Sequence, residues 1–380
     1  MAVGIIAEYN PFHNGHLYQI EEVKRKFPNE EIVLVLSGNF TQRGDISIID
    51  KWKKKDLALK SGINLVVELP FLFATQSADI FSYGALSILE KLKVDKLIFG
   101  SESDNIDDLT VIAKCQLENE DFDKLVKIYS KFGENYPTAI SKAVYDLCGK
   151  KVTTPNDLLG ISYIKQILKN NYNIKPFCIK REDNYHSKSI KTITSGSAIR
   201  EGLLKNSDIT SAVPEYVLPY LIKDNLHFRD DYFKLLKYKI ITSEDLSIYQ
   251  TVDEGIENKL KKEINNCTTY EELITKLKTK RYTYNKISRM LLHILVGLKK
   301  DFCKNNNDIN YIRILGFDNI GKKYLNRVKK DVNINILSKF KRGISLLDFE
   351  LVATSIYSIP KNETNLIDDE YKNHLNTEVK

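Results

Sequence analysis

The sequence has few of the features that mark secreted, zinc-binding or membrane proteins. Only five of its 380 residues are cysteines, and no two of them form a C-x-x-C pair. Neither a disulfide framework nor a zinc ribbon is therefore expected. The N-terminus has no basic segment ahead of a long apolar run, and the most apolar stretch, residues 65–78, is interrupted by Glu68 and Pro70. That stretch is too short to span a bilayer, so we expect a soluble, cytoplasmic protein that does not contact a membrane.

What is present is the composition of a folded protein with a mild positive charge. Hydrophobic residues make up 42% of the chain, charged residues make up 28%, and the formal net charge is +7. This apolar content is sufficient for a real core, and the length suggests two or three domains. The positive excess permits an anionic partner without requiring one.

The first half of the chain alternates strand-like and helix-like segments. Five short apolar runs, the first at residues 3–7 and the last at residues 174–180, are separated by stretches with helical periodicity. Nearly continuous apolar strands between helices are typical of a parallel sheet that is covered on both faces. Residues 1–205 are therefore predicted to form a doubly wound, Rossmann-like α/β domain.

Helical patterns dominate the second half, so residues 206–360 are predicted to form a mainly helical domain. Residues 361–380 are polar and lack clear periodicity, and we expect an irregular tail there. Helices are expected at 216–226, 256–263, 270–277 and 286–300, and short strands at 311–315 and 333–337.

The most informative segment is residues 4–16, which read GIIAEYNPFHNGH. A buried strand is predicted to end near Ala7, and after a tight loop a helix begins near His16. The carboxyl edge of such a strand is where open parallel sheets bind ligands, and a helix N-terminus attracts phosphate. His13 and His16 can donate hydrogen bonds to phosphoryl oxygens and stabilise charge on a pentavalent phosphorus and on departing pyrophosphate. An H-x-x-H pair could instead bind a metal ion or lie on the surface without a role, but no third ligand is near in the sequence.

The full string resembles the G-x-x-x-P-x-H-x-G-H fingerprint of the nucleotidylyltransferase superfamily. A second signature of that superfamily, S-x-S/T-x-I-R, is similar to residues 195–200, SGSAIR. Ser195 begins a predicted helix, Ser197 and the backbone amides would face phosphate, and Arg200 would make a bidentate phosphate contact. Taken alone, this second segment could also be an ordinary capped helix.

Further stretches narrow the resemblance to the bacterial tRNA(Met) cytidine acetate ligase family. The match extends to about Pro360, and Tyr311–Phe317 belongs to it in the second half. The motifs of the first half, in order, are residues 7–20, 37–45 (SGNFTQRGD), 65–70 (LVVELP), 99–102 (FGSE), 155–160 (PNDLLG), 180–186 (KREDNYH) and 195–200.

The resemblance implies an ATP-dependent ligase that forms a C–N bond. It would convert acetate to acetyl-adenylate and pyrophosphate, and then transfer the acetyl group to N4 of the wobble cytidine of elongator tRNA(Met). The catalytic residues would be His13, His16, Ser197 and Arg200. Family members often have Ala-Thr at the positions of Gly196 and Ser197, a change that keeps a small residue and a hydroxyl. The family's ATP site maps onto Ile6, Ala7, Glu8, Tyr9, Asn10, Pro11, Phe12, His13, Asn14, Gly15, His16, Leu17, Tyr18, Gln19, Gly100, Asn156 and Arg181.

Several of these positions have their own chemical interpretation. Adenine or ribose could pack on the bare backbone of Gly100, just after the fourth strand, and Arg181 could close over the triphosphate. Asn156 could bind ATP or simply cap the helix that it opens. Arg43, Asp45 and Lys51 follow the second strand and would face the acceptor. A divalent cation is expected on the β- and γ-phosphates, although no acidic cluster predicts a dedicated metal site.

Basic residues are concentrated in two clusters of the second half. Residues 276–289 hold six basic and no acidic residues, with Tyr282 and Tyr284 between them, and residues 322–342 hold eight basic residues and one acid, with Phe340 among them. The two clusters together carry +13, which exceeds the total of +7, so the rest of the chain is net −6. Backbone phosphates attract Lys and Arg, and unstacked bases stack on aromatic rings. The tentative tRNA-binding residues are Lys280, Arg281, Lys339, Lys341 and Arg342, and Lys51, Lys53, Lys54 and Lys55 could extend the surface.

Other interpretations remain open at this stage. Each basic cluster could be a solvated helix face. A nucleotidylyltransferase that adenylates a small phosphorylated cofactor precursor would share the fold and both signatures, but it would not need a basic helical domain. A non-catalytic RNA-binding protein with a degenerate nucleotide fold would not need intact His13, His16 and Arg200. The sequence does not indicate an oligomeric state.

Overall fold

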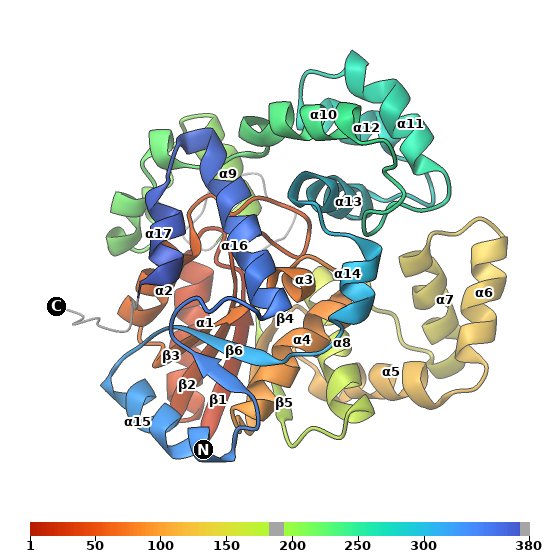
Figure 1. The fold of residues 1–380 in the computed structure, drawn as a ribbon. Coiled ribbons are helices and arrows are strands. Elements are labelled where there is room, and N and C mark those ends of the chain that lie inside the picture. The colour runs from red at the N-terminus through yellow and green to blue at the C-terminus, as the bar shows by residue number, and fades with distance from the viewer. Residues whose placement is uncertain (182–193, 373–380) are drawn as a thin grey trace.

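A computed structural model describes residues 1–181 and 194–372, which are organised around one seven-stranded sheet (Figure 1). The strand order is β5-β4-β1-β2-β3-β6-β7, in which β1 to β5 are parallel, β6 is antiparallel to β3, and β7 is parallel to β6. The strands are β1 (Ala2–Ala7), β2 (Glu31–Ser37), β3 (Leu65–Leu69), β4 (Lys96–Ser101), β5 (Lys175–Lys180), β6 (Tyr311–Phe317) and β7 (Asn335–Leu337).

Helices connect and cover these strands. In the first half they are α1 (Asn14–Lys26), α2 (Lys51–Lys60), α3 (Phe71–Ala74), α4 (Ala78–Lys91), α5 (Ile106–Glu118), α6 (Phe122–Lys131), α7 (Tyr136–Cys148), α8 (Pro155–Lys169) and α9 (Gly196–Leu204). In the second half they are α10 (Phe233–Thr242), α11 (Ile256–Glu263), α12 (Tyr270–Leu277), α13 (Tyr284–Val296), α14 (Lys300–Asn305), α15 (Asn319–Val328), α16 (Ser345–Ser358) and α17 (Asn365–Tyr371). Short 3-10 turns are η1 (Thr210–Ala212), η2 (Glu215–Tyr220), η3 (Lys223–Asn225), η4 (Arg229–Tyr232), η5 (Ile264–Asn266), η6 (Lys329–Asp331) and η7 (Ile359–Lys361).

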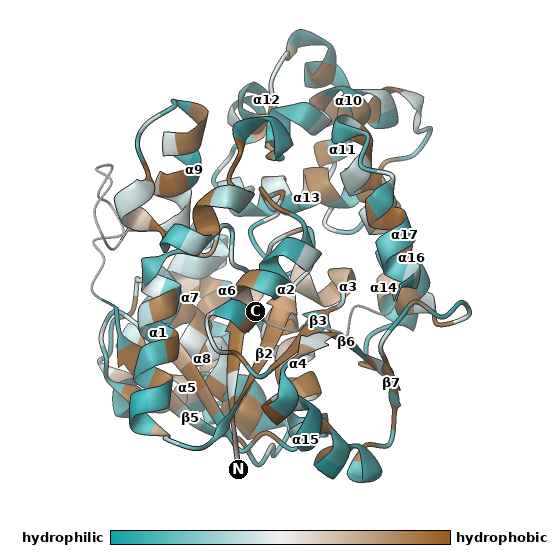
Figure 2. Ribbon diagram, turned by 90° about the vertical axis from the view of Figure 1, so that its left-hand side faces the viewer, coloured by the Kyte–Doolittle hydropathy of each residue, from teal (hydrophilic) through white to brown (hydrophobic). Residues whose placement is uncertain are grey.

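The strands are buried on both faces, as their continuous apolar runs predict. Successive side chains of a strand point to opposite faces, so Leu34 and Val66 join one core together with α1 and α2, whereas Val33 and Val67 join a second core together with α4 and α8. Figure 2 shows the apolar strands enclosed by helices whose outer surfaces are more polar. This is the doubly wound α/β architecture that the sequence predicts.

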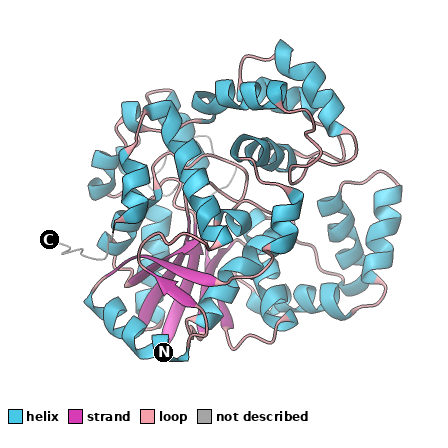
Figure 3. Cartoon of the chain, viewed as in Figure 1, coloured by secondary structure: helices cyan, strands magenta, loops and turns pink. Residues whose placement is uncertain are grey.

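The order of the strands determines where a ligand can bind. β1 lies between β4 and β2, so the chain leaves β1 toward one side of the sheet and reaches β4 on the other. In such sheets the crevice outside the carboxyl ends of the strands is the binding site. The β1–α1 loop lies at this edge, and the helices α10 to α13 lie beyond the same edge (Figure 3).

The helical character of residues 206–310 is confirmed, with two local exceptions. The predicted helices 256–263 and 270–277 match α11 and α12. The continuous helix predicted at 286–300 is wrong, because α13 ends at Val296, Gly297 has a φ of +86°, and α14 begins at Lys300. The continuous helix predicted at 216–226 is wrong, because η2 and η3 occupy this stretch and Pro219 lies within η2. Proline lacks the N–H that a longer α-helix would need at that position.

The end of the chain differs from the sequence-based expectation. The two predicted short strands exist, but they extend the sheet of the first half, so residues 311–337 do not lie only among the C-terminal helices. The irregular tail predicted from residue 361 is wrong for residues 365–371, which form α17 with Glu370 fully buried. The boundary predicted near residue 205 stays a prediction. No described helix has both the length and the apolar character that crossing a membrane requires.

Candidate functional site

The β1–α1 loop holds two histidines side by side at the start of α1. The backbone N–H of Gly15 donates to His13 Nδ1 (3.1 Å), and the backbone N–H of His13 donates to His16 Nδ1 (3.3 Å). The two rings stack with 3.8 Å between their centroids. Because each Nδ1 accepts a hydrogen bond, the neutral rings carry their protons on Nε2. Both histidines can therefore donate from Nε2 to an anionic ligand.

His16 is held in the neutral form. Burial lowers its pKa well below 6.5, and the charges of His13 and Arg181 lower it further. A neutral imidazole that donates one hydrogen bond does not need to lose or gain a proton when a phosphate arrives. This suits a group that stabilises developing charge without acting as an acid or base.

Three buried residues of the loop lie around His16. Tyr9 and Phe12 are almost fully buried, and their ring centroids lie 4.7 Å and 5.6 Å from that of His16. Tyr9 has a φ of +48°, and Pro11 is buried beside it. Any contact of these three residues with ATP would therefore involve the backbone, because their side chains belong to the core.

Asn10 anchors the loop to the segment after β2. Its side-chain amide donates to the carbonyl of Ile46 (3.2 Å), and its Oδ1 accepts from the backbone N–H of Ile48 (2.9 Å). The side chain is buried, and both its nitrogen and its oxygen make a hydrogen bond in this contact. Asn10 thus shapes the predicted ATP loop through its backbone.

The other predicted ATP-site residues flank this loop. Ile6 and Ala7 end β1, and Gly15, Leu17 and Tyr18 lie half-buried on the first turns of α1. The side chains of Asn14 and Gln19 donate to the carbonyls of Ser211 (2.9 Å) and Ile98 (3.4 Å).

The second signature segment contacts the first directly. Ser195 caps α9, because its Oγ accepts from the backbone N–H of Ala198 (3.3 Å), and it also lies 2.9 Å from Ser197 Oγ. Arg200 donates to the carbonyl of Asn10 (2.6 Å) across 190 positions of sequence. A Cβ on Gly196 would lie only 2.8 Å from that same carbonyl, so the small residue permits this close approach.

Gly100, Asn156 and Arg181 are brought together from three elements. Arg181 donates to Asn156 Oδ1 (3.2 Å), and Asn156 donates to Glu102 Oε1 (2.6 Å). Thr154 is the residue before the first turn of α8, so the interpretation of Asn156 as a helix cap is wrong. Gly100 lies within β4 and not after it, and the aliphatic part of Arg181 already covers its backbone, since a Cβ there would be 3.0 Å from Arg181 Cγ.

Glu8 and Lys54 lie next to the loop, and the pKa values of both side chains are shifted by burial. Glu8 Oε1 accepts from the backbone N–H of Gln42 (2.6 Å), and burial raises the pKa of this carboxyl group. Lys54 Nζ donates to the carbonyls of Glu8 (2.9 Å), Ser37 (2.8 Å) and Gly38 (2.5 Å). Burial lowers the pKa of Lys54 to about 7. Lys54 therefore joins the carboxyl ends of β1 and β2, a role that no sequence motif indicates.

The expectation that the lysines of α2 form a nucleic-acid surface is wrong. Lys51, Lys54 and Lys55 are buried, and only Lys53 is partly exposed. Lys51 and Lys54 turn toward the sheet, where their carboxylate and carbonyl acceptors lie, whereas Lys55 pairs with Asp56 of the same helix (2.5 Å). Lys51 therefore does not face an acceptor molecule.

The predicted stacking residues are corrected in the same way. Tyr282 and Phe340 are buried, so bases cannot stack on their rings. Tyr282 donates to the carbonyl of Asp253, and Phe340 packs edge-on against Tyr371. The five candidate tRNA-binding residues Lys280, Arg281, Lys339, Lys341 and Arg342 are exposed.

A second charged cluster lies behind the site and is closed to solvent. Lys51 Nζ lies 2.6 Å from Glu68 Oε1 and 2.7 Å from Glu370 Oε1, and Arg313 pairs with Glu370 and, at 3.6 Å, with Glu68. Thr354 Oγ1 donates to Glu370 (2.5 Å). We call these four charged residues, Lys51, Glu68, Arg313 and Glu370, the buried ion cluster.

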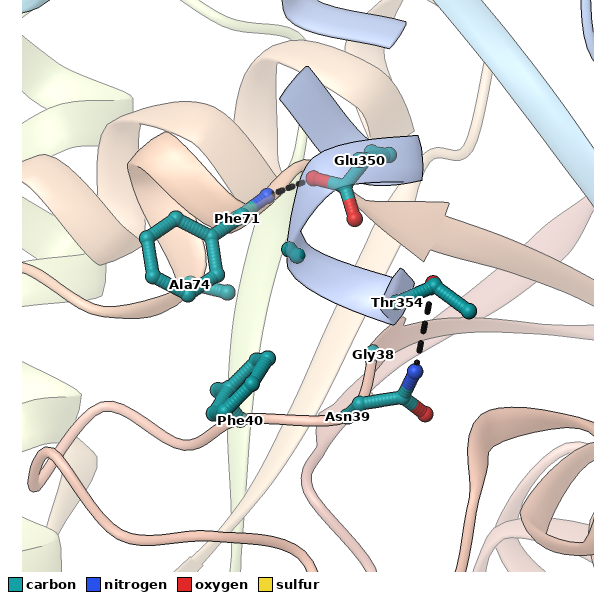
Figure 4. A pocket seen from close by; sticks show the side chains of 8 residues that line it. Gly38, Asn39, Phe40, Phe71, Ala74, Glu350 and Thr354 are labelled. Carbon is teal, nitrogen blue, oxygen red and sulfur yellow. Dashed lines mark hydrogen bonds between the residues drawn. The ribbon is translucent and has the colours of Figure 1, made fainter. Parts of the chain in front are cut away.

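Glu350 lies next to the buried ion cluster at the wall of a small pocket. Figure 4 shows it facing Phe71, whose backbone N–H donates to Glu350 Oε1, and shows Asn39 donating to Thr354. Burial, together with the charge of Glu68, raises the pKa of Glu350 to about 8. The residues that line the pocket come from α16, α3 and the segment after β2, so the pocket lies where α16 packs against these two elements.

The described residues offer no grouped metal ligands. Within residues 1–181 and 194–372, no three His, Cys, Asp or Glu side chains are placed so that they could hold an ion together. Residues Glu182–His186 of one motif, and Ile193 next to the second signature, lie outside the described residues.

The fold and the paired signature segments define a class of protein. Residues 1–372 match the family described as HIGH Nucleotidyl Transferase. Two relatives have the name tRNA(Met) cytidine acetate ligase. The one from Clostridium acetobutylicum is 37% identical and covers 97% of this chain and 98% of its own length. The one from Mycoplasma mobile is 41% identical over 79% of this chain and all of its own length.

Solved structures agree with this result. Crystal structures of Thermotoga maritima TmcAL, one apo and one bound with alpha-thio ATP, are 28% identical to this chain and superpose with TM-scores of 0.89 and 0.87. Each match covers 97% of this chain and 96% of the other. The chain belongs to the tRNA(Met) cytidine acetate ligase family.

Proposed function

We propose that this protein uses ATP to activate acetate and transfers the acetyl group to N4 of the wobble cytidine of elongator tRNA(Met) in the cytoplasm. The observation that carries the proposal is the contact between the two signature segments, in which Arg200 donates to the carbonyl of Asn10 beside His13 and His16. The names of the relatives supply the acyl group and the acceptor.

In the first step, a carboxylate oxygen of acetate attacks the α-phosphorus of ATP, and the bond to the pyrophosphate oxygen breaks. Negative charge grows on the transferring and departing oxygens. His13 and His16 donate from Nε2, and Arg200 and the N-terminus of α9 add positive charge on the opposite side. The protein contributes position and charge neutralisation in this step.

In the second step, the cytidine amine attacks the carbonyl carbon of acetyl-adenylate. The amide bond forms, the bond between the carbonyl carbon and the AMP oxygen breaks so that AMP leaves with its electron pair, and the proton of the amine passes to water. Glu8 lies under the same loop with a raised pKa and one hydrogen-bonded oxygen.

ATP is proposed to lie across the carboxyl ends of β1 and β4, with its triphosphate at the histidine pair and its nucleoside toward Asn156 and Arg181. A divalent cation would be held by the phosphates, because the described residues offer no cluster of ligands for it. Such a cation would neutralise phosphate charge.

The direct test of the first step is exchange of labelled pyrophosphate into ATP. We expect exchange that depends on acetate and does not require tRNA. Exchange that instead depends on a small phosphorylated cofactor precursor would show that the protein is an adenylyltransferase of another kind. If no carboxylate supports exchange, the proposed function is wrong.

The exposed basic residues are proposed to bind the backbone of the tRNA. Neutralising Lys339, Lys341 and Arg342 with glutamine should weaken tRNA binding and reduce the slope of log K against log salt by about 2, since each lost phosphate contact contributes about 0.7–0.9. The matched control replaces Lys114, Lys124 and Lys127, which are exposed on α5 and α6, by glutamine. An equal change of slope in both variants would show that the effect is one of overall charge and not of contact.

A further inference from the structure

Arg200 is fixed from two sides before any ligand binds. One terminal nitrogen donates to the carbonyl of Asn10 (2.6 Å), and the other lies 3.1 Å from Asp45 Oδ2. A guanidinium has five N–H donors. Among the described residues Arg200 makes no other hydrogen bond, so most of its donors stay available on the side that is turned away from these two partners.

Asp45 is itself held by a second arginine. Arg229 Nε donates to Asp45 Oδ1 (2.7 Å), and the backbone N–H of Ile46 donates to the same oxygen (3.0 Å). Burial opposes ionisation of this carboxyl group, but the charges of Arg200 and Arg229 outweigh burial and lower its pKa. Asp45 therefore carries a full negative charge between two guanidinium groups that belong to different elements.

Arg229 is in turn held by the C-terminal helices. It donates to the hydroxyl of Tyr284 (2.7 Å) at the start of α13, and its guanidinium carbon lies 5.5 Å from the ring centre of Tyr284 and 5.8 Å from that of Tyr270. Cation–π contacts of this kind keep a buried guanidinium in one orientation.

The loop that contains Asp45 packs against α13, the helix on which Tyr284 lies. Ser288 of α13 donates to the carbonyl of Gly44 (2.8 Å), and a Cβ on Gly44 would lie 2.3 Å from the backbone nitrogen of Arg289. Gly44 also has a φ of +74°, so this position favours glycine for both reasons. The close packing of this loop on α13 therefore fixes the position of Asp45.

We propose that Asp45, held by Arg229 and seated on α13, is a positioning residue that aims the free N–H groups of Arg200 at the phosphates of ATP. The inference deepens the proposed function, since it takes Arg200 as the phosphate contact of the adenylation step. It assigns to the C-terminal helices a part in the ATP site that neither signature segment indicates. Without the carboxylate, the two guanidinium groups would repel each other and Arg200 would leave its place.

The test measures ATP binding by calorimetry, which does not depend on catalytic turnover. Asp45→Asn should raise the Kd of ATP about 10- to 100-fold, the usual effect of losing a charge-assisted hydrogen bond. In an Arg200→Ala background the same substitution should have no further effect, because Asp45 acts only through Arg200. Asp45→Glu should restore part of the affinity. In the wild-type background, Arg229→Gln should produce a smaller loss, which should also vanish in the Arg200→Ala background.

The control is Arg327→Gln, which removes an exposed arginine that donates to Glu31 (3.0 Å) at the opposite edge of the sheet. It should leave the Kd of ATP unchanged. An unchanged Kd in Asp45→Asn, or an additive loss in the Arg200→Ala background, would overturn the inference. If Asp45→Asn does not fold, Arg229→Gln with and without Arg200→Ala gives the same decision. If the protein binds ATP but shows no acetate-dependent exchange, the proposed function is wrong, and the effect of Asp45 on the Kd of ATP can still be measured.

Discussion

Two charged assemblies lie behind the same edge of the sheet, and they differ in how their charges are satisfied. The ATP-site assembly, proposed as His13, His16, Arg200 and Asp45, includes a guanidinium that has N–H groups without a partner among the described residues, that of Arg200. In the buried ion cluster, by contrast, each charge faces at least one opposite charge and all four side chains are closed to solvent. Similar residue types thus line the proposed ATP site in one place and stabilise the packing of α17 in the other. The difference lies in solvent access and not in composition, since the buried ion cluster also has atoms without a hydrogen-bond partner in the described part of the chain, Glu68 Oε2 and Arg313 Nε.

The largest effect is expected from breaking the buried ion cluster. Lys51→Met removes the cation that lies between Glu68 and Glu370 and leaves two buried carboxylates with one guanidinium. The free energy of unfolding should fall by about 3–5 kcal/mol, the usual result of removing one partner of a buried ion pair. Denaturant unfolding measures this change. Lys53→Met, whose side chain is one-third exposed, is the matched control and should cost less than about 1 kcal/mol. Equal losses of unfolding free energy in Lys51→Met and Lys53→Met would contradict the stabilising role of the buried ion cluster.

A substitution in the ATP-site assembly should affect the reaction instead of the fold. His16→Ala removes a neutral donor to the phosphates, so the rate of acetate-dependent pyrophosphate exchange should fall by about 10²–10³-fold. Binding of tRNA should stay largely intact, because the exposed basic residues lie elsewhere. The measurements are exchange kinetics and a tRNA titration. Normal exchange together with lost tRNA binding would refute this role of His16.

His16 and His293 both have lowered pKa values, so the dependence of stability on pH gives a further test. Burial lowers the pKa of His293 to about 4, and its ring nitrogens lie 3.0 Å and 3.2 Å from the carbonyls of Thr75 and Gln250. The folded-state pKa lies below the usual value of 6.5, so the unfolded chain binds more protons and the protein loses stability as the pH falls below 6.5. At pH 5 the loss that is due to His293 should be about 2 kcal/mol relative to pH 8.

Unfolding at the two pH values in wild type and in His293→Gln measures this contribution. The variant should be less stable at pH 8 but should show less of the acid-dependent loss. His16→Gln should reduce the acid-dependent loss as well, because burial also lowers the pKa of His16. Identical pH profiles in wild type and His293→Gln would contradict the assignment.

Local parts of this architecture could be predicted from the sequence, and non-local parts could not. The β1–α1 loop and the cap of α9 depend on residues within a few positions of each other, so their patterns are visible in the chain. The Arg229–Asp45 pair joins residues 184 positions apart, and no periodicity indicates such a contact. The contact of Arg200 with Asn10 joins residues 190 positions apart and is likewise not indicated by the sequence, which predicts only a phosphate contact for Arg200.

Errors in prediction concern residues whose environment is decided by tertiary structure. The lysines of α2 are expected on the surface because lysine is rarely buried, but Lys54 donates to the carbonyls of Ser37 and Gly38, and Lys51 pairs with Glu68 and Glu370. Tyr282 and Phe340 lie among basic residues in the sequence, yet their rings turn inward. Residues 365–371 lack an apolar periodicity because one of the two side chains they bury is the carboxylate of Glu370, whose partners are Lys51 and Arg313; the other is Leu366.

The most direct test of the account is nucleoside analysis of elongator tRNA(Met) after incubation with the protein, ATP and acetate. The account predicts one acetylated cytidine at the wobble position, formed only when ATP, acetate and the protein are all present, and absent with Arg200→Ala. A tRNA that gains no acetyl group while the protein turns over ATP, or one that is acetylated at full rate by Arg200→Ala, would contradict it.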